Sequence, residues 1–372
     1  AFKRLKGGGW TLVGWMGVVA GFVILSYYCV VAGWAVDYLW LALKGTFSHQ
    51  HAAQVPQLFG DLLASDLSQL FWQALFMGMT VWIVIGGVKG GLERANKIMM
   101  PILFLILVVL AGYGLISPGG SRAFQFLFAP DWHKLDPPAM LEALGHAFFS
   151  LSLGMGAMLT YGSYADEEIS IPKVAITVSI MDTLVALLAG LAIFPIVFSY
   201  GMAPAAGPGL VFKTLPILFS QMPGGTLIAI LFFLLLVFAA LTSAISLLEV
   251  VVAYYCDELK WDRAKATLIA GVLIFMLGVP AALSNNLLKD WHLLGSRNFL
   301  DSIDFLSTNY LLPLGGLLIT LFAGWVLTSK VGREELLKGG GSQRFYRIWF
   351  FLIRYISPVF VALVLLNKIG LF

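Results

Sequence analysis

Residues 148–160 have the sequence FFSLSLGMGAMLT, and this stretch decides the fold. Its apolar residues are interrupted by small and hydroxyl-bearing ones: Ser150, Ser152, Gly154, Gly156 and Ala157. Small residues inside a membrane helix let neighbouring helices pack closely. Glycine also lowers helix stability by about 1 kcal/mol, and an unwound backbone at membrane depth persists only where it lines a cavity. The stretch therefore predicts either a closely packed helix or a broken helix beside a site.

The apolar character continues in both directions along the chain. Of 372 residues, 59% are hydrophobic and 12% are charged, whereas a soluble domain carries about 25% charged residues. A helix needs about 20 mostly apolar residues to cross a bilayer. Nine stretches satisfy this length: 10–43, 70–88, 98–116, 141–164, 174–200, 226–255, 266–283, 299–327 and 346–371. We therefore predict an all-α polytopic protein in which residues 1–372 form a single transmembrane unit in a lipid bilayer.

Composition also excludes several classes of function. The net charge of +3 is spread over short loops, so no basic face indicates nucleic acid. Cys29 and Cys256 lie far apart in or beside apolar stretches, which does not favour a disulfide framework. No metal-ligand motif, nucleophile–base set or Gly-rich phosphate loop is present, so we predict that the protein is not an enzyme.

The distribution of basic residues predicts the orientation. Fifteen of the 23 lysines and arginines lie in one set of alternate loops and seven in the other. Because cytoplasmic loops are the basic ones, the N-terminus is predicted to be cytoplasmic and the C-terminus, after nine spans, to lie outside. Arg354 belongs to neither set, and we expect its side chain to reach back to the cytoplasmic face.

Four ionisable residues lie within predicted spans, where they are costly and indicate function by default. They are His146, Asp182, Glu249 and Asp304. His146 is near the outer end of its span and either reaches the headgroups or belongs to a site. Asp182 and Glu249 lie well inside apolar sequence, so a cation, a proton or a buried hydrogen-bond partner must accompany each of them.

A second cluster of small and polar residues lies at 238–246, FAALTSAIS. Ala239, Thr242 and Ser243 share one helix face. Their hydroxyl and carbonyl oxygens suit a small hard cation, although Thr and Ser also bond to the backbone of their own helix. Together with Ser150 and Asp182, they suggest two oxygen-lined cation positions.

These motifs resemble those of the bacterial branch of the neurotransmitter:sodium symporter family. The resemblance rests on six stretches: SYYCVVAGW at 26–34, GHAFFSLSLGMGAMLTYGSY at 145–164, MDTLVALLAG at 181–190, FAALTSAIS at 238–246, DEL at 257–259 and FLDSIDF at 299–305. It implies two five-helix repeats of opposite topology.

The spans then correspond to the third to eleventh helices of the family. Residues 1–116 would hold the third to fifth helices of the first repeat, 141–328 the second repeat and 344–372 an extra C-terminal helix. A discontinuous helix is expected at about 141–164. The first two helices of the family would have no counterpart in these residues.

The resemblance also implies a substrate site. Tyr28 would meet the substrate carboxylate, and Phe149 would cover the substrate as an aromatic lid. Ile24, Met155 and Leu247 would line the pocket for the side chain. The site would also include the hydroxyls of Ser150, Ser152 and Ser243.

Ion sites and gates are implied in the same way. Ser150 and Asp182 would bind a first Na+, with Asp182 standing where relatives usually have Asn. The second Na+ would be bound by Ala239, Thr242 and Ser243. The gates would be Phe149 and Asp304 on the outside and Asp257, Tyr161 and Tyr164 on the inside. His146 stands where the family usually has Gln.

Asp182 also bears on chloride. Many bacterial members replace the chloride with a carboxylate one turn after the Asn position, and this chain has Ala186 there. We expect Asp182 itself to supply the negative charge, so that chloride is not required.

The function implied is sodium-coupled symport of a neutral, hydrophobic amino acid into the cell by alternating access, in a bacterial inner membrane. One alternative substrate is an osmolyte or another zwitterion. A quaternary amine would call for an aromatic cage, whereas Ile24, Met155 and Leu247 are aliphatic or thioether side chains. Another alternative is an amino-acid-binding sensor or remnant that does not transport. The sequence does not indicate the oligomeric state.

Overall fold

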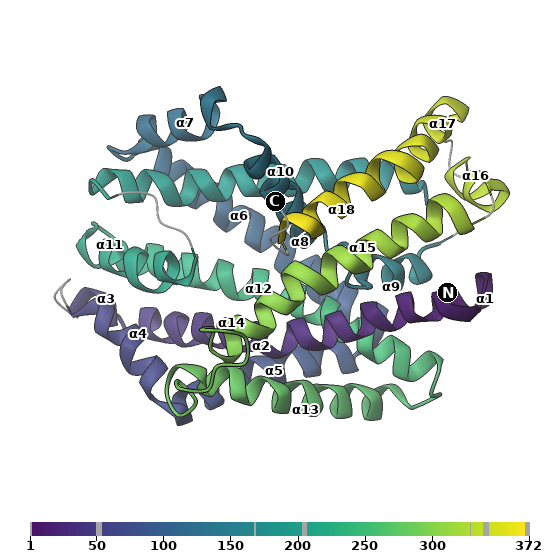
Figure 1. The fold of residues 1–372 in the computed structure, drawn as a ribbon. Helices are drawn as coiled ribbons and strands as arrows, with labels where there is room; N and C mark the ends of the chain where they lie inside the picture. Colours follow the sequence, from purple (N-terminus) through teal and green to yellow (C-terminus); the bar gives the residue numbers. More distant parts are fainter. Residues whose placement is uncertain are drawn as a thin grey trace.

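The structure, a computed structural model, describes residues 2–49, 54–166, 169–202, 207–327, 329–337 and 342–368. These residues form a bundle of long helices that run roughly side by side (Figure 1). One end of the bundle carries α1 (Phe2–Leu5), α16 (Ser329–Leu337) and α17 (Gln343–Phe351). The opposite end carries α3 (Thr46–His49), α4 (Val55–Ala64) and α11 (Leu215–Gln221).

Eight helical segments in the described residues are long and apolar enough to cross a membrane. They are Gly8–Leu43, Asp66–Ile85, Val88–Ile116, Ile171–Ser199, Gly225–Asp257, Arg263–Asn285, Phe299–Val326 and Gln343–Lys368. The main helices in these segments are α2 (Thr11–Leu43), α5 (Asp66–Ile85), α6 (Arg94–Ile116), α10 (Ile171–Ser199), α12 (Gly225–Asp257), α13 (Arg263–Ala282), α14 (Phe299–Leu306), α15 (Leu312–Leu321), α17 and α18 (Ser357–Lys368). The predicted all-α membrane fold is confirmed.

The remaining predicted span, at 141–164, is interrupted. It consists of α8 (Pro137–Ser150) and α9 (Ala157–Tyr164), and residues 151–156 between them are not helical. Neither half is long enough to span a membrane alone. The prediction of a discontinuous helix at this position is therefore confirmed, and the alternative of a continuous, closely packed helix is wrong.

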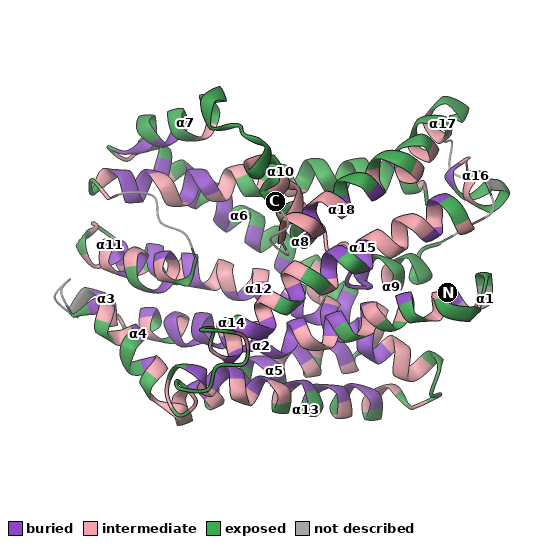
Figure 2. Cartoon of the chain, in the orientation of Figure 1, coloured by how far each residue is buried: buried purple, intermediate pink, exposed green. Residues whose placement is uncertain are grey.

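Helix α2 lies at the centre of the bundle. Its neighbours include α12, α5 and α13. In the most apolar part of the α2 span 61% of residues are buried, compared with 17% in Gln343–Lys368; Figure 2 shows this contrast along the two segments. At Gly33 an added Cβ would lie 2.9 Å from backbone atoms of Trp72 and Gln73, so only glycine permits this approach of α5. The core is thus built around α2.

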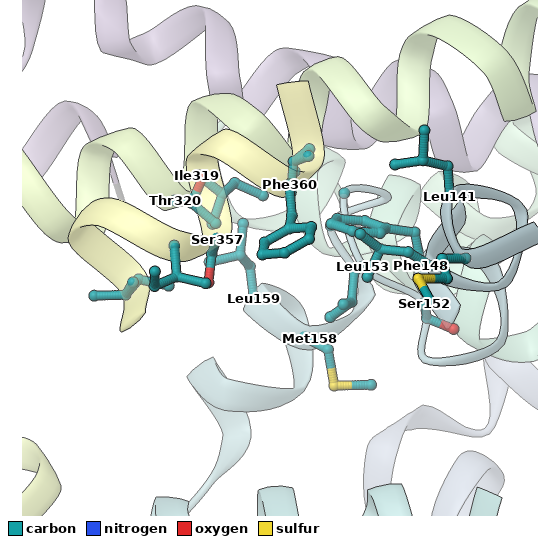
Figure 3. Close-up of a pocket in the computed structure, with 18 residues that line it drawn as sticks. Leu141, Phe148, Ser152, Leu153, Met158, Leu159, Ile319, Thr320, Ser357 and Phe360 are labelled. Atoms are coloured by element: carbon teal, nitrogen blue, oxygen red, sulfur yellow. The ribbon is translucent and has the colours of Figure 1, made fainter. Parts of the chain in front are cut away.

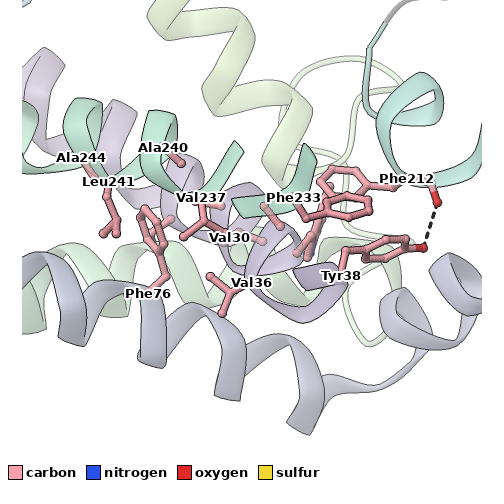
Figure 4. Packing of buried hydrophobic residues seen from close by; sticks show 14 of the residues in the cluster. Val30, Val36, Tyr38, Phe76, Phe212, Phe233, Val237, Ala240, Leu241 and Ala244 are labelled. Atoms are coloured by element: carbon pink, nitrogen blue, oxygen red, sulfur yellow. Dashed lines mark hydrogen bonds between the residues drawn. The ribbon is translucent and has the colours of Figure 1, made fainter. Parts of the chain in front are cut away.

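Aromatic side chains close one end of this core. Tyr38 of α2 packs against Phe212 and Phe233, with ring centroids 5.1 and 5.2 Å away (Figure 4). Its hydroxyl donates a hydrogen bond of 2.9 Å to the Phe212 carbonyl oxygen. Phe212 belongs to the short helix η4 (Leu210–Thr214), which continues into α11. The loop before α12 is therefore fastened to the central helix.

The other described helices are short or lie at the periphery. Helix α7 (Gly120–Phe128) packs along α6 and α10. Several π-helical turns adjoin longer helices: η2 (Val88–Glu93), η6 (Ser307–Leu311), η7 (Phe322–Val326) and η9 (Leu352–Ile356). Short 3₁₀ turns lie at η1 (Gly8–Trp10), η3 (Trp132–Lys134) and η5 (Leu283–Asn285).

Candidate functional site

The break between α8 and α9 has a backbone that a helix cannot adopt. Ser152, Gly154 and Gly156 have φ angles of 55°, 84° and 79°, in the left-handed region. Glycine adopts this region without penalty, whereas Ser152 is a non-glycine residue there, which is uncommon and marks functional or strained positions. Gly154 also lies so close to the Leu312 carbonyl of α15 that a Cβ would collide with it. Sequence and packing together therefore fix the break.

Ser150, the last residue of α8, meets Asp182 of α10. Its hydroxyl donates a hydrogen bond of 3.1 Å to the Asp182 Oδ2 atom. No ion pair joins Asp182 to a basic residue in the described part of the chain. A carboxylate and a hydroxyl at a helix break are hard oxygen donors, and unwound backbone carbonyls at such breaks coordinate Na+ in transporters. These two residues fit a small hard cation.

The predicted second cation face on α12 is partly self-bonded. The Thr242 hydroxyl donates to the Ala239 carbonyl oxygen at 2.9 Å, so two of the three predicted ligand oxygens lie together. The hydroxyl of Ser246 donates to the Thr242 carbonyl at 2.9 Å. Ser243 is exposed, and its hydroxyl lies beside that of Tyr28 on α2. The Thr242 hydroxyl is therefore bonded within its own helix, whereas the Ser243 hydroxyl faces Tyr28.

The predicted apolar pocket residues share one buried cluster. Ile24, Met155 and Leu247 are 1%, 4% and 5% exposed and belong to the main hydrophobic core. The break packs against α2 and α12, since Gly156 lies against Gly17 and Val250. Three elements, namely α2, the break and α12, therefore converge where the pocket was predicted.

Phe149 and Ser152 lie apart from this cluster. Phe149 is 37% exposed near the end of α8. Ser152 lines a different cavity of about 770 Å³, between the α8–α9 segment, α15 and α18 (Figure 3). The other hydroxyls on the lining of this cavity are those of Thr320 and Ser357, and the rest is mainly apolar. The structure therefore does not bring Ser152 to the α2–α12 face.

A polar cluster that the sequence did not reveal surrounds Glu249, which is fully buried. The Arg263 guanidinium donates to both carboxylate oxygens, with Nη1–Oε1 at 3.2 Å and Nη2–Oε2 at 2.5 Å. The Tyr164 hydroxyl donates to Oε1 at 2.7 Å. Arg263 Nε also donates to the Val84 carbonyl at 3.0 Å. Glu249 was singled out only as a buried charge, and this cluster supplies the hydrogen-bond partner it requires.

The remaining predicted inner-gate residues lie on the same side of the bundle. The Tyr161 hydroxyl shares a hydrogen bond of 2.6 Å with Ser246, which joins α9 to α12. Asp257 is exposed at the end of α12, near Tyr164. Helix α9, the second half of the broken helix, is therefore bound to α12 through both of its tyrosines.

Asp304 of α14 is half-buried beside the middle of α2. The hydroxyl of Tyr27, a buried residue of α2, lies near Asp304 and Ser307. Tyr27 was not predicted from the sequence, because a tyrosine on a buried helix usually belongs to the core. His146 is exposed on α8.

The model of the Sodium:neurotransmitter symporter family matches residues 54–371. The chain belongs to this family. It is similar to YhdH of Bacillus subtilis, named an uncharacterized sodium-dependent transporter, with 41% identity over 99% of this chain and 82% of the relative. It is also similar to the sodium-dependent serotonin transporter of Drosophila melanogaster, at 26% identity over 68% of this chain and 48% of that protein.

A solved structure agrees with the fold of this symporter. The crystal structure of MhsT in complex with L-phenylalanine has a TM-score of 0.90 and 42% identity, and the match covers 99% of this chain and 83% of MhsT. The resemblance stated from the sequence motifs is confirmed. The protein is a multi-pass membrane protein of a sodium-dependent transporter family, and these relatives are transporters, not enzymes.

Proposed function

We propose that this symporter moves a neutral, hydrophobic amino acid into the cell together with Na+. The observation that carries the proposal is the pairing of Ser150 with Asp182 at the break between α8 and α9. The break adjoins the buried cluster of Ile24, Met155 and Leu247. The sodium-dependent relatives and the L-phenylalanine bound by MhsT support both parts of the proposal.

Two sodium positions follow from the oxygen atoms that the fold supplies. Ser150 and Asp182 contribute to the first, and Ala239, Thr242 and Ser243 to the second. Because Asp182 already has a negative charge, it offsets the charge of Na+ without a bound anion. Transport is therefore independent of chloride.

The pocket chemistry favours an apolar side chain. Tyr28 and Ser243 place two hydroxyls together on facing helices, and these suit the polar end of an amino acid, with Tyr28 binding its carboxylate. Ile24, Met155 and Leu247 offer aliphatic and thioether surface. Methionine is flexible, so side chains of several shapes fit.

Alternating access requires closure on both sides of the site. On the outer side we assign closure to Phe149 and Asp304. On the inner side we assign it to Asp257, the two tyrosines of α9, and the Glu249–Arg263 pair that anchors Tyr164. We assign this inner end to the cytoplasm of a bacterium, with the N-terminus on that side and the C-terminus outside, because cytoplasmic loops are the basic ones.

The test is uptake by the complete gene product that includes this chain, purified and reconstituted in liposomes. An inward sodium gradient should drive accumulation of labelled leucine or phenylalanine, and replacing chloride with gluconate should leave the rate unchanged. Loss of uptake in gluconate would contradict the chloride prediction. Uptake of betaine in place of apolar amino acids would contradict the substrate prediction, and binding without accumulation would contradict transport.

Asp182→Asn tests whether the negative charge of this carboxylate is needed for Na+ binding. The variant keeps an oxygen donor but removes the charge, so we expect a higher sodium concentration for half-maximal uptake and a new stimulation by chloride. Asp61→Asn is a matched control, because Asp61 is an exposed carboxylate on α4 outside the proposed site. Equal behaviour of the two variants would remove Asp182 from the ion site.

A further inference from the structure

Arg354 is fixed by aromatic side chains within the last membrane-spanning segment. It belongs to η9, between α17 and α18. Its guanidinium carbon lies 4.3 Å from the ring centroid of Trp325, 5.5 Å from that of Phe350 and 5.7 Å from that of Tyr355. The Trp325 indole N–H also donates to the Arg354 carbonyl at 3.0 Å. The charge is therefore held at a defined place beside η7.

The chain offers this charge no counter-ion among the described residues. The ion pairs found there involve other residues. Four elements that pack against η9, namely α15, η7, α17 and α18, contain no Asp or Glu. The Nε atom of Arg354 is buried without a hydrogen-bond partner. Arginine stays protonated in proteins, and no side chain among the described residues is shown accepting from its Nη atoms, so these can meet an acceptor from outside the chain.

The surroundings indicate what carries that acceptor. Arg344 and Arg347 precede Arg354 on the same membrane-spanning segment, and both are exposed. The same segment exposes large apolar side chains typical of a lipid-facing surface: Ile348, Phe351, Leu352, Tyr355 and Ile356. A molecule with an anionic headgroup and apolar chains can contact both the arginines and the exposed apolar side chains. A free inorganic anion can contact only the arginines.

We propose that Arg354, Arg347 and Trp325 form a binding site for the phosphate headgroup of an anionic phospholipid. A guanidinium presents paired N–H donors that match phosphate oxygens, and basic pockets between membrane helices bind anionic headgroups. The basic loops place this end of the bundle at the cytoplasmic leaflet. From its sequence position, Arg354 was expected only to reach back to the cytoplasmic face. In this proposal it also binds a lipid headgroup at that surface.

The first test measures thermal unfolding of the complete gene product in mixed micelles. Phosphatidylglycerol and phosphatidylcholine with the same acyl chains are compared, with an added arm of inorganic phosphate in detergent alone. Phosphatidylglycerol should raise the unfolding midpoint by several degrees more than phosphatidylcholine, and phosphate alone should not. Arg354→Gln should lose most of this difference, and Arg354→Lys should keep part of it.

Arg122→Gln is the matched control, because Arg122 packs over Phe198 at 4.8 Å at the other end of the bundle. This variant should keep the full lipid effect. The proposal is overturned if Arg354→Gln retains the difference, if Arg122→Gln loses it equally, or if inorganic phosphate reproduces it. The last result would indicate a free-anion site instead of a lipid site.

A second measurement leaves Arg354 unchanged, in case its substitution prevents folding. The fluorescence of Trp325 is obtained as the difference between the native protein and Trp325→Phe in liposomes. Brominated phosphatidylglycerol should quench this difference more strongly than brominated phosphatidylcholine, and the exposed-site variant Arg347→Gln should reduce the preference. Equal quenching by the two lipids would overturn the proposal.

Discussion

Replacing Glu249 with glutamine should open the end of the bundle that we assign to the cytoplasm. The carboxylate is fully buried, while the Arg263 side chain is 26% exposed. Removing one partner of a buried ion pair costs about 3–5 kcal/mol, and we expect the lower value because Arg263 reaches solvent. A change of about 3 kcal/mol shifts an equilibrium roughly 150-fold. The inward-open population should rise by up to that factor.

The assay follows a cysteine placed above the pair. Ser246 lies one turn from Glu249 on α12 and is bonded to Tyr161, so opening of α9 should expose it. In a background with Cys29 and Cys256 replaced by alanine, Ser246→Cys is labelled by a membrane-impermeant thiol reagent in inside-out vesicles. Adding Glu249→Gln should increase the labelling rate strongly.

Glu93→Gln provides the matched control. Glu93 pairs with Lys97 at 2.6 Å, but the two side chains are 48% and 73% exposed, and such surface pairs contribute about 0–1 kcal/mol. This variant should not change the labelling rate. Arg263→Gln should increase labelling at least as much as Glu249→Gln, because it leaves the fully buried carboxylate unpaired. The double variant should have less than the summed effect, because both substitutions remove one interaction. Equal labelling with Glu249→Gln and Glu93→Gln would refute the inner-closure role.

Two other substitutions test the packing. Gly154→Ala should abolish uptake and lower stability by more than about 1 kcal/mol, because its φ of 84° and the nearby Leu312 carbonyl exclude a Cβ. Gly162→Ala, where an added Cβ meets nothing within 4 Å, should retain uptake; equal loss in both would show that the break is not specifically constrained. Tyr38→Phe removes the hydrogen bond to the Phe212 carbonyl and should destabilise the loop before α12 by about 1 kcal/mol. Limited proteolysis should then cut residues 207–225 faster than in the unsubstituted protein. An unchanged rate would contradict this prediction.

The broken helix could be predicted because the residues at the break left it as one of two alternatives and the family resemblance favoured it. Two glycines with left-handed φ angles follow a pair of serines within a few residues, and composition alone signals weak helix there. The start of α8 was placed a few residues late, at 141 instead of Pro137. Asp136 caps this helix by accepting a hydrogen bond of 2.8 Å from the Ala139 N–H, and Pro137 suits the first turn. These polar capping signals lie outside the apolar stretch used to locate the span.

The partner of Glu249 could not be predicted in the same way. Glu249 is on α12 and Arg263 begins α13, so the chain must reverse direction before the two side chains meet. No helical period relates the two positions. Asp262 caps α13 by accepting from the Ala264 N–H at 3.0 Å, which sets where Arg263 enters the bundle. The pairing therefore depends on the packing of α5, α9, α12 and α13.

The short helix α9 links the proposed ion site to the inner closure. Gly154 and Gly156 precede it at the break and give it pivots, while Tyr161 and Tyr164 bind its other end to α12. Na+ at the proposed site of Ser150 and Asp182 would order the break, and only the eight residues of α9 separate the break from the end that we assign to the cytoplasm. A helix this short bends little, so a movement of the backbone at the break moves the whole of α9. That movement must strain or break the hydrogen bonds of Tyr161 and Tyr164 to α12. Coupling between ion binding and inner opening follows from this connection.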